Sequence, residues 1–197
     1  LLLAWKSGTA ANIVDRLADR GFRIETVETR NLGDVATALE RIGRLTGHEA
    51  GGRQAAARFR DGLARLEREH GDDPPIRVFY QVSKSPLYTV NGSHFISELI
   101  GVCGGRNVFA DLSDLAPLVD VEAVVVRDPE VMLASADSGP DAFGVWQRWP
   151  EMAANRLDNH FLLPAGQIGR ATPRLLEAGE TLCKVLGRAR ANRQRHR

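Results

Sequence analysis

A long stretch of helical periodicity, set between two stretches that alternate strands and helices, constrains the fold of this chain most. In residues 33–70 apolar side chains recur at steps of three and four with charged side chains between them, the pattern of an amphipathic helix. The second half alone would span roughly 27 Å, enough to cross from one domain to another. The apolar positions are Val35, Leu39, Ile42, Ala56, Phe59, Leu63 and Leu66.

Glycine and proline punctuate this stretch. Gly47, Gly51 and Gly52 interrupt it, and because each glycine weakens a helix interior by about 1 kcal/mol, they can kink or divide the helix. Pro74 and Pro75 end it, since proline can neither donate the helical hydrogen bond nor continue the helix. We therefore predict a linking helix over residues 33–71.

The residues before the linking helix predict a strand, a helix and a second strand. An apolar run over residues 1–5 is followed by helical spacing over 13–18 and an alternating run over 22–27. Gly21 stands where the end of the helix requires a left-handed residue. This unit is the repeating element of a parallel sheet. We take residues 1–32 to be the remnant of an N-terminal α/β lobe.

The residues after the linking helix predict a complete α/β lobe over 76–197. Ser93 is expected to cap one helix, and Thr172 with Pro173 to begin the last one. The fold class is therefore α/β, with two Rossmann-like lobes joined by a long backbone helix and the N-terminal lobe incomplete. Such lobes favour a ligand between them. The predicted strands are 76–82, 107–109, 131–134 and 161–163, and the predicted helices 93–103, 120–127, 142–149 and the last one from 172.

Charge and hydropathy exclude two classes of function. Residues 188–197 carry five of the 26 lysines and arginines and no acid, so 21 basic groups face 25 acidic ones elsewhere. A mildly acidic body argues against a nucleic-acid partner, and we interpret the basic end as a solvated helix end and not a functional patch. The sequence has no apolar run of about 18 residues, so we predict no direct membrane insertion.

The first residues do not resemble a natural start. The chain begins at Leu1 without methionine, charged leader or cleavage site. We therefore expect the natural N-terminus, with the first part of its lobe and any leader, to be missing from this sequence.

Motifs of enzyme and metal chemistry are not found in the sequence. The five histidines show no ligand spacing, and no glycine-rich loop has the order that cradles phosphate. Ser93 lacks the Gly-x-Ser-x-Gly elbow of a hydrolase. We predict no catalytic residue, no cofactor and no metal site, hence no enzyme. The alternative from a different class is an α/β enzyme whose catalytic residues precede Leu1.

Two cysteines leave two possibilities open. Cys103 ends a predicted helix and Cys183 lies in the last one. Judged from these positions alone, the two cysteines are as compatible with two buried free thiols as with a disulfide. A bridge would close a loop of 80 residues and stabilise the fold by roughly 4 to 5 kcal/mol in the chain-entropy account. It would also place the protein outside the reducing cytosol.

Taken together, several segments resemble the periplasmic cobalamin-binding proteins of ABC importers, which belong to the class of substrate-binding proteins with a helical backbone. The similarity covers nearly the whole chain. It implies a periplasmic monomer with two α/β lobes and little hinge motion, which captures cobalamin or a related corrinoid as cargo and delivers it to an inner-membrane permease. The segments are Leu3–Gly8, Arg77–Val82, Ser85–Thr89, Val102–Phe109, Asp128–Met132, Ala171–Arg174 and Leu182–Cys183.

The resemblance also assigns roles to individual residues. Trp5 and Tyr88 match aromatic residues that the family places against the corrin ring from opposite lobes; the alternative for each is an ordinary aromatic residue. Glu122 matches an acid that docks on arginines of the permease, or simply interacts with the helix dipole. Cys103 and Cys183 match a family disulfide.

The ligand-side loop departs from the family pattern. Ala116 stands where a further aromatic residue is expected, and residues 164–170 lack the expected aromatic and acidic groups. Gln167 and Arg170 remain candidates for hydrogen bonds to amide or phosphate edges of a ligand. A related corrinoid is therefore compatible with the sequence, and so is a siderophore or haem, for which Tyr88 would be the axial ligand.

Overall fold

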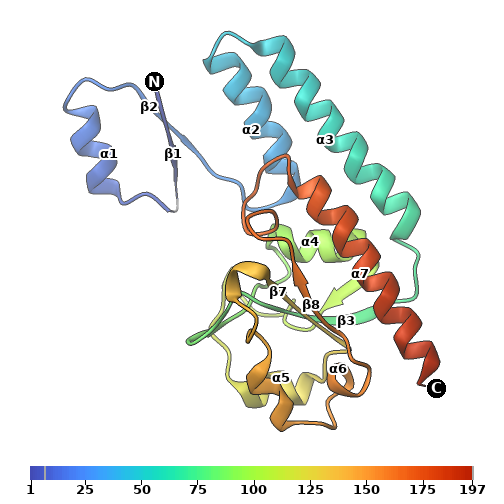
Figure 1. Ribbon diagram of the computed structural model, residues 1–197. Coiled ribbons are helices and arrows are strands. Elements are labelled where there is room, and N and C mark those ends of the chain that lie inside the picture. The colour runs from blue at the N-terminus through green and yellow to red at the C-terminus, as the bar shows by residue number, and fades with distance from the viewer. Residues whose placement is uncertain (7, 197) are drawn as a thin grey trace.

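The computed structural model describes residues 1–6 and 8–196. Ser7 of the Trp5 segment and Arg197 of the basic end lie outside the described residues. The chain forms an N-terminal α/β unit, a pair of long helices and a larger α/β unit, in that order (Figure 1). No helix among the described residues has both the length and the apolar composition needed to cross a membrane.

The N-terminal unit consists of β1 (Leu2–Trp5), α1 (Ala11–Ala18) and β2 (Ile24–Val27). The two strands are parallel, as the sequence pattern predicts. Gly21 adopts a φ of 79° after α1, a conformation that glycine reaches without steric cost. This unit stands to one side of the rest of the molecule (Figure 1). Its status as an incomplete lobe stays a prediction.

The expected single linking helix is two helices. α2 (Leu32–Leu45) and α3 (Glu49–His70) lie side by side as a hairpin (Figure 1). The turn between them contains Gly47 with a φ of 74°, and a Cβ added to Gly43 would lie 2.9 Å from the Cα of Gly52. Glycine therefore allows both the reversal and the close approach of the two backbones. The helix expected over 33–71 is therefore not continuous, and the division falls at the glycines that were expected to kink or divide it.

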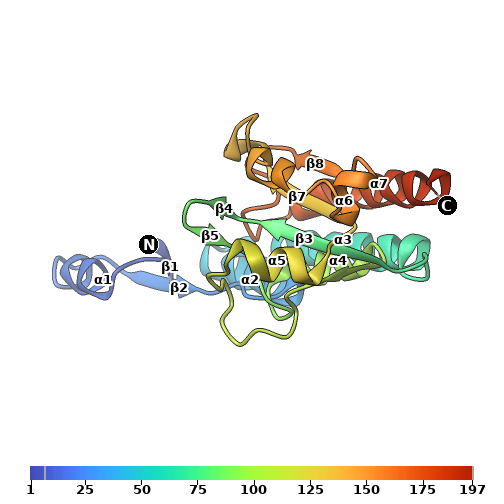
Figure 2. The same cartoon turned by 90° about the horizontal axis from the view of Figure 1, so that it is seen from below.

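The larger unit is built on a parallel sheet with strand order β6-β3-β7-β8. α3, α4 and α7 cover one face, and α5 and α6 cover the other (Figures 1 and 2). The elements are β3 (Ile76–Gln81), β4 (Ser83–Lys84), β5 (Leu87–Tyr88), α4 (Phe95–Val102), β6 (Gly105–Asn107), α5 (Val121–Arg127), β7 (Val131–Ser135), α6 (Ala153–Arg156), β8 (His160–Leu163) and α7 (Leu175–Arg195).

The side chains of β3 alternate between two cores. Val78 and Tyr80 pack among the helices α3, α4 and α7, whereas Phe79 packs on the other face with Phe109 and Trp146, each at 5.7 Å between ring centroids. This alternation follows from the pleat of a strand that is buried on both faces. The strand predicted at 76–82 is therefore one of the two interior strands of the sheet.

Several local predictions differ from the structure, and the strand expected over 107–109 is β6, which spans Gly105–Asn107. The N-cap of α4 is His94 and not Ser93, because the His94 Nδ1 atom accepts the Ile96 N–H. Residues 144–148 form a 3-10 helix in place of the α-helix expected over 142–149. α7 begins at Leu175 and not at Thr172. Residues 172–175 form a turn instead, in which the Leu175 N–H donates to the Thr172 carbonyl.

The disulfide between Cys103 and Cys183 is present and joins the end of α4 to α7. Arg190 lies further along α7 than Cys183 and is only 7% exposed. Its guanidinium donates to the Cys103 carbonyl at 2.7 Å, to the Pro74 carbonyl at 2.8 Å and to the Asp73 carboxylate at 3.0 Å. Arg190 thus ties α7 to the ends of both α3 and α4.

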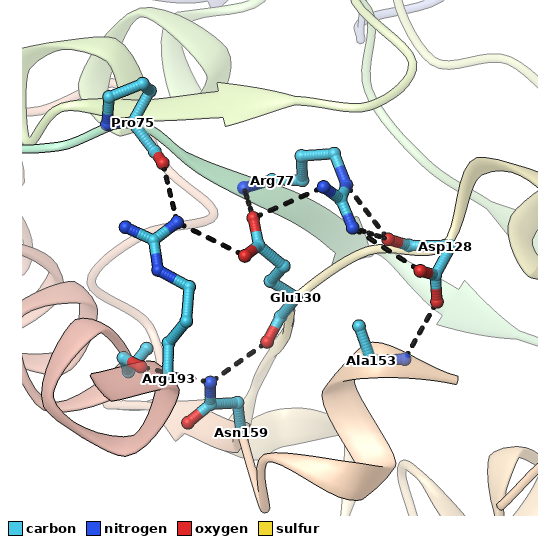
Figure 3. Close-up of polar contacts among 8 residues, drawn as sticks. Pro75, Arg77, Asp128, Glu130, Ala153, Asn159 and Arg193 are labelled. Carbon is cyan, nitrogen blue, oxygen red and sulfur yellow. Dashed lines mark hydrogen bonds and ion pairs between the residues drawn. The ribbon is translucent and has the colours of Figure 1, made fainter. Parts of the chain in front are cut away.

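A second polar network occupies the amino ends of β3 and β7 (Figure 3). The buried Glu130 accepts from Arg193 at 3.2 Å and from the Arg77 backbone N–H at 3.0 Å, and Arg193 also donates to the Pro75 carbonyl. Two of the arginines at the basic end are therefore structural. The interpretation of that end as solvated is wrong for Arg190, which is buried, and for Arg193, which is half-buried and bonded to Glu130 and Pro75.

Replacing Arg190 by methionine should lower the free energy of unfolding by roughly 2 to 4 kcal/mol, because it leaves one carboxylate and two carbonyl groups without their donor. Urea unfolding followed by circular dichroism measures the loss. Lys184→Met on the exposed side of the same helix is the control, and we expect a change below about 0.5 kcal/mol. Equal stability of the two variants would contradict the structural role of Arg190.

Candidate functional site

A cavity of about 500 Å³ lies between the N-terminal unit and the larger unit. Trp5 and Val27 reach it from the ends of β1 and β2, Tyr80 from the end of β3, and residues 169–173 from the loop after β8. Within each of the two sheets these strands run parallel, and each contributes residues at or after its carboxyl end. Open α/β sheets bind ligands at this edge, so the cavity is the candidate site.

The wall of the cavity is largely apolar. α2 contributes Val35, Leu39 and Ile42, and the start of α4 contributes Phe95 and Ile96. The polar or charged side chains on the described wall are few: Trp5, Thr29, Tyr80, His94, Arg170 and Thr172. A wall of this composition suits a bulky, mostly apolar guest whose orientation is set by a small number of hydrogen bonds.

Trp5 is held in place at the rim of β1. Its indole N–H donates to the Glu28 carboxylate at 3.1 Å, and its ring lies over Gly8, where an added Cβ would come within 1.9 Å of the ring. The side chain is nevertheless 60% exposed. A large aromatic surface that is fixed on one side and open on the other is suited to contact a flat ligand.

The remaining predicted site residues divide into two groups. Arg170 lines the cavity with Trp5, whereas Tyr88 and Gln167 are not among the described residues of the wall. Tyr88 is close by, because its carbonyl accepts the N–H of Val82, which does line the cavity. Gln167 points to Glu177 at 3.5 Å. The ligand roles of these residues stay predictions.

Arg170 belongs to a loop that is anchored to the end of β7. The Asp137 carboxylate accepts from the Ser135 hydroxyl at 2.8 Å and from the Gly166 N–H at 3.0 Å. These two hydrogen bonds, with a smaller contribution from the charge of Arg170, lower the pKa of Asp137. Asp137 is thus an ionised anchor for the loop, and the exposed Arg170 side chain emerges from that loop at the cavity wall.

His94 is a site residue that the sequence pattern did not reveal. Its ring stacks near Phe95, with 4.3 Å between centroids, and lines the cavity. Burial lowers the pKa of His94 from 6.5 to about 4, so the imidazole is neutral at physiological pH. The signal was present in the sequence, since His94 stands directly before the apolar helical pattern, but the usual preference for serine as a cap pointed one residue earlier.

The start of α4 also fixes the segment that joins the two units. The Phe95 N–H donates to the Arg30 carbonyl at 2.9 Å, and the Glu98 carboxylate accepts the Leu32 N–H at 2.7 Å. Arg30 lies between β2 and α2, and Leu32 is the first residue of α2. These contacts hold the cavity wall of the N-terminal side against the wall formed by α4.

Within residues 1–6 and 8–196, no group of three or more histidine, cysteine, aspartate or glutamate side chains is placed to hold a metal ion. The polar groups on the described wall also do not form a nucleophile, base and orienting acid in hydrogen-bond contact. The largely apolar wall with its few polar side chains suits binding by shape, aromatic contact and a few hydrogen bonds.

The neutral state of His94 predicts a pH dependence of stability. Between about pH 6.5 and pH 4 the unfolded chain binds a proton at His94 that the folded chain does not, so the free energy of unfolding should fall as the pH decreases through this window. His94→Asn keeps an acceptor for the helix cap but does not titrate, and should show a smaller fall. Urea unfolding at pH 7.5 and pH 5 measures both.

Part of the acid sensitivity should remain in that variant, because burial also lowers the pKa of His160. His160→Asn is the matched comparison. An identical pH dependence in wild type and His94→Asn would show that His94 does not resist protonation in the folded state.

Comparison with known proteins places the chain among binding proteins. The sequence pattern of the family described as periplasmic binding protein matches residues 18–162. The vitamin B12-binding protein of Vibrio cholerae serotype O1 is 33% identical over 187 residues, which cover 94% of this chain and 67% of that protein.

Solved structures give the same grouping. The crystal structure of the periplasmic vitamin B12 binding protein of Vibrio cholerae is 33% identical and superposes with a TM-score of 0.81, covering 95% of this chain and 74% of that one. A periplasmic heme-binding protein from Roseiflexus sp. RS-1, 16% identical, superposes with a TM-score of 0.82 over 95% of this chain and 75% of that one. The second likeness shows the fold alone. The predicted α/β binding-protein fold is confirmed.

Proposed function

The chain belongs to the periplasmic binding protein family, which places it in the periplasm, and from this premise we propose that it captures cobalamin or a related corrinoid for an ABC importer. The corrinoid is cargo and arrives with its metal already coordinated. The protein then supplies a binding surface and no covalent step, so it acts without a catalytic residue or a cofactor of its own. We propose further that it acts as a monomer.

The single observation that carries this proposal is the apolar cavity with Trp5 exposed at its rim. A corrin is a broad, flat ring with apolar faces and a polar periphery of amides. Aromatic side chains bury such faces at little entropic cost. The identity of 33% to a vitamin B12-binding protein over 94% of the chain supports the same ligand class.

Haem and siderophores are less well supported as ligands. Haem binding through a tyrosine needs a phenolate ligand, and the tyrosine on the described wall is Tyr80, which is 3% exposed. Burial raises the pKa of Tyr80 and so opposes phenolate formation. Tyr88, the axial ligand expected for haem, is not among the described wall residues. We retain Tyr88, Gln167 and Arg170 as proposed contacts of a corrinoid at or beside the cavity.

Titration with cyanocobalamin should give binding of one ligand per chain, seen as heat in calorimetry and as a change in the visible spectrum of the corrinoid. Trp5→Ala should weaken the affinity by roughly ten- to a hundredfold, because a buried aromatic contact is worth on the order of 1.4 to 2.8 kcal/mol.

The control for this substitution is Phe22→Ala. Phe22 is 50% exposed in the same N-terminal unit and is not among the described wall residues. The Phe22→Ala variant should therefore bind cyanocobalamin with the affinity of wild type. If wild type shows neither heat nor spectral change, the corrinoid function is wrong. If Trp5→Ala and Phe22→Ala bind alike, Trp5 does not contact the ligand.

We propose that Glu122 contributes to docking on the permease. It lies exposed in the first turn of α5, whose cap is provided by Asp120, so the carboxylate of Glu122 is not needed to cap the helix. Docking charges act mainly on the rate of encounter and are screened by salt. Exposure and charge at the surface are the features that support this role.

Glu122→Gln should therefore slow association with the permease of the importer, reconstituted in nanodiscs, by about two- to fivefold at low salt, with the difference shrinking at 0.5 M salt. Cyanocobalamin affinity should not change. Glu151→Gln, another exposed acid of the same unit, is the control. Equal association rates for the two variants at low salt would contradict the docking role of Glu122 and leave its interaction with the helix dipole as its only role.

A further inference from the structure

The two ring nitrogens of His94 have different surroundings. Nδ1 accepts the Ile96 N–H at 3.1 Å and caps α4. For Nε2, the part of the chain that the structure describes offers no hydrogen-bond partner. The residue lines the cavity, and its ring face is turned toward Phe95. Nε2 is therefore the nitrogen of His94 that remains for a guest in the cavity.

The cap determines which nitrogen carries the proton. A nitrogen that accepts a hydrogen bond from a backbone N–H must present its lone pair, so Nδ1 is unprotonated. In a neutral imidazole the proton is then on Nε2. The hydrogen bond of 3.1 Å from the Ile96 N–H to Nδ1 thus sets the tautomer of His94.

We propose that His94 is a specificity-determining residue that donates a hydrogen bond from Nε2–H to an acceptor oxygen on the edge of the bound corrinoid. This assignment rests on the proposed function. The acceptor belongs to one of two parts of such a ligand, the amide side chains around the ring or the phosphate of the nucleotide loop. Both offer an oxygen that a neutral N–H donor satisfies.

The same geometry argues against His94 as a ligand of the corrinoid metal. Coordination through Nε2 would require the lone pair on Nε2 and hence the proton on Nδ1, where it would face the Ile96 N–H. The cap of α4 would be lost. The low pKa of His94 keeps the ring neutral, so the donor is uncharged and its strength does not vary above about pH 5.

Because the surroundings of His94 are apolar, its single N–H donor affects which ligands bind. The start of α4 surrounds His94 with Phe95 and Ile96, and Val90 lies on the same wall. A ligand that brings no acceptor to this place would leave the donor without water and without a partner, at a cost comparable to a lost hydrogen bond. His94 thus favours a guest with a polar edge over a purely apolar guest of the same shape.

Two substitutions separate the donor from the cap. His94→Asn keeps an acceptor at the position of Nδ1 and removes the donor at the position of Nε2. His94→Gln keeps a donor near the position of Nε2 and removes the acceptor of the cap. Calorimetric titration of the full chain with cyanocobalamin at pH 7.5 measures the affinity of each variant, and urea unfolding measures its stability.

We expect His94→Asn to bind cyanocobalamin about five- to tenfold more weakly than wild type while unfolding at a similar urea concentration. His94→Gln should bind within about twofold of wild type and unfold at a lower urea concentration. Unchanged affinity of His94→Asn overturns the proposal, and so does an equal loss of affinity in both variants, which would indicate a role of ring shape or of the cap. Failure of wild type to bind is a failure of the corrinoid function itself.

Repeating the titrations with dicyanocobinamide, which has the ring amides but no nucleotide loop, locates the acceptor. If the loss in His94→Asn persists, the acceptor is a ring amide. If the loss disappears while wild type still binds cobinamide, the acceptor is on the nucleotide loop. Either result supports His94 as a donor, whereas a tighter complex of His94→Asn with cobinamide and with cyanocobalamin overturns it.

Discussion

The anchoring of α4 is the constraint on which the rest of the structure depends. At its end, the disulfide from Cys103 and the hydrogen bond from Arg190 hold it to α7. At its start, the Phe95 N–H and the Glu98 carboxylate hold the segment that leads to α2. One short helix thereby contacts α7 at one end and the segment leading from the N-terminal unit to α2 at the other, and the cavity has a defined wall at its start.

The amino ends and the carboxyl ends of the strands in the parallel sheet have different roles. The amino ends of β3 and β7 are occupied by the network around Glu130 and Arg193, whose buried charges are paired (Figure 3). The carboxyl ends are lined by apolar side chains with a few polar groups. Because strands in a parallel sheet all end at the same edge, stabilising contacts and the binding site do not compete for the same residues.

Much of the fold follows from local patterns, and part of the site follows from a resemblance. The strand at 76–82 was predictable because five of its seven residues are apolar or aromatic and proline precedes it. The pairing of Cys103 with Cys183 was implied by the family and is present. The division of residues 33–71 into α2 and α3 was marked by glycines but its geometry was not, since two helices that pack at Gly43 and Gly52 and one continuous helix have the same periodicity.

The sequence by itself determined the α/β class, the order of the elements and the kinship with periplasmic binding proteins, because these depend on periodicity and on residues close together in the chain. The tertiary structure decided that Trp5 and Arg170 share one cavity, that Arg190 and Arg193 form ion pairs with Asp73 and Glu130, and that His94 lines the cavity with one nitrogen used for a helix cap. These facts depend on contacts between segments distant in the chain. A sequence pattern records the type of each side chain, whereas burial and the direction of a donor arise when separate elements pack together.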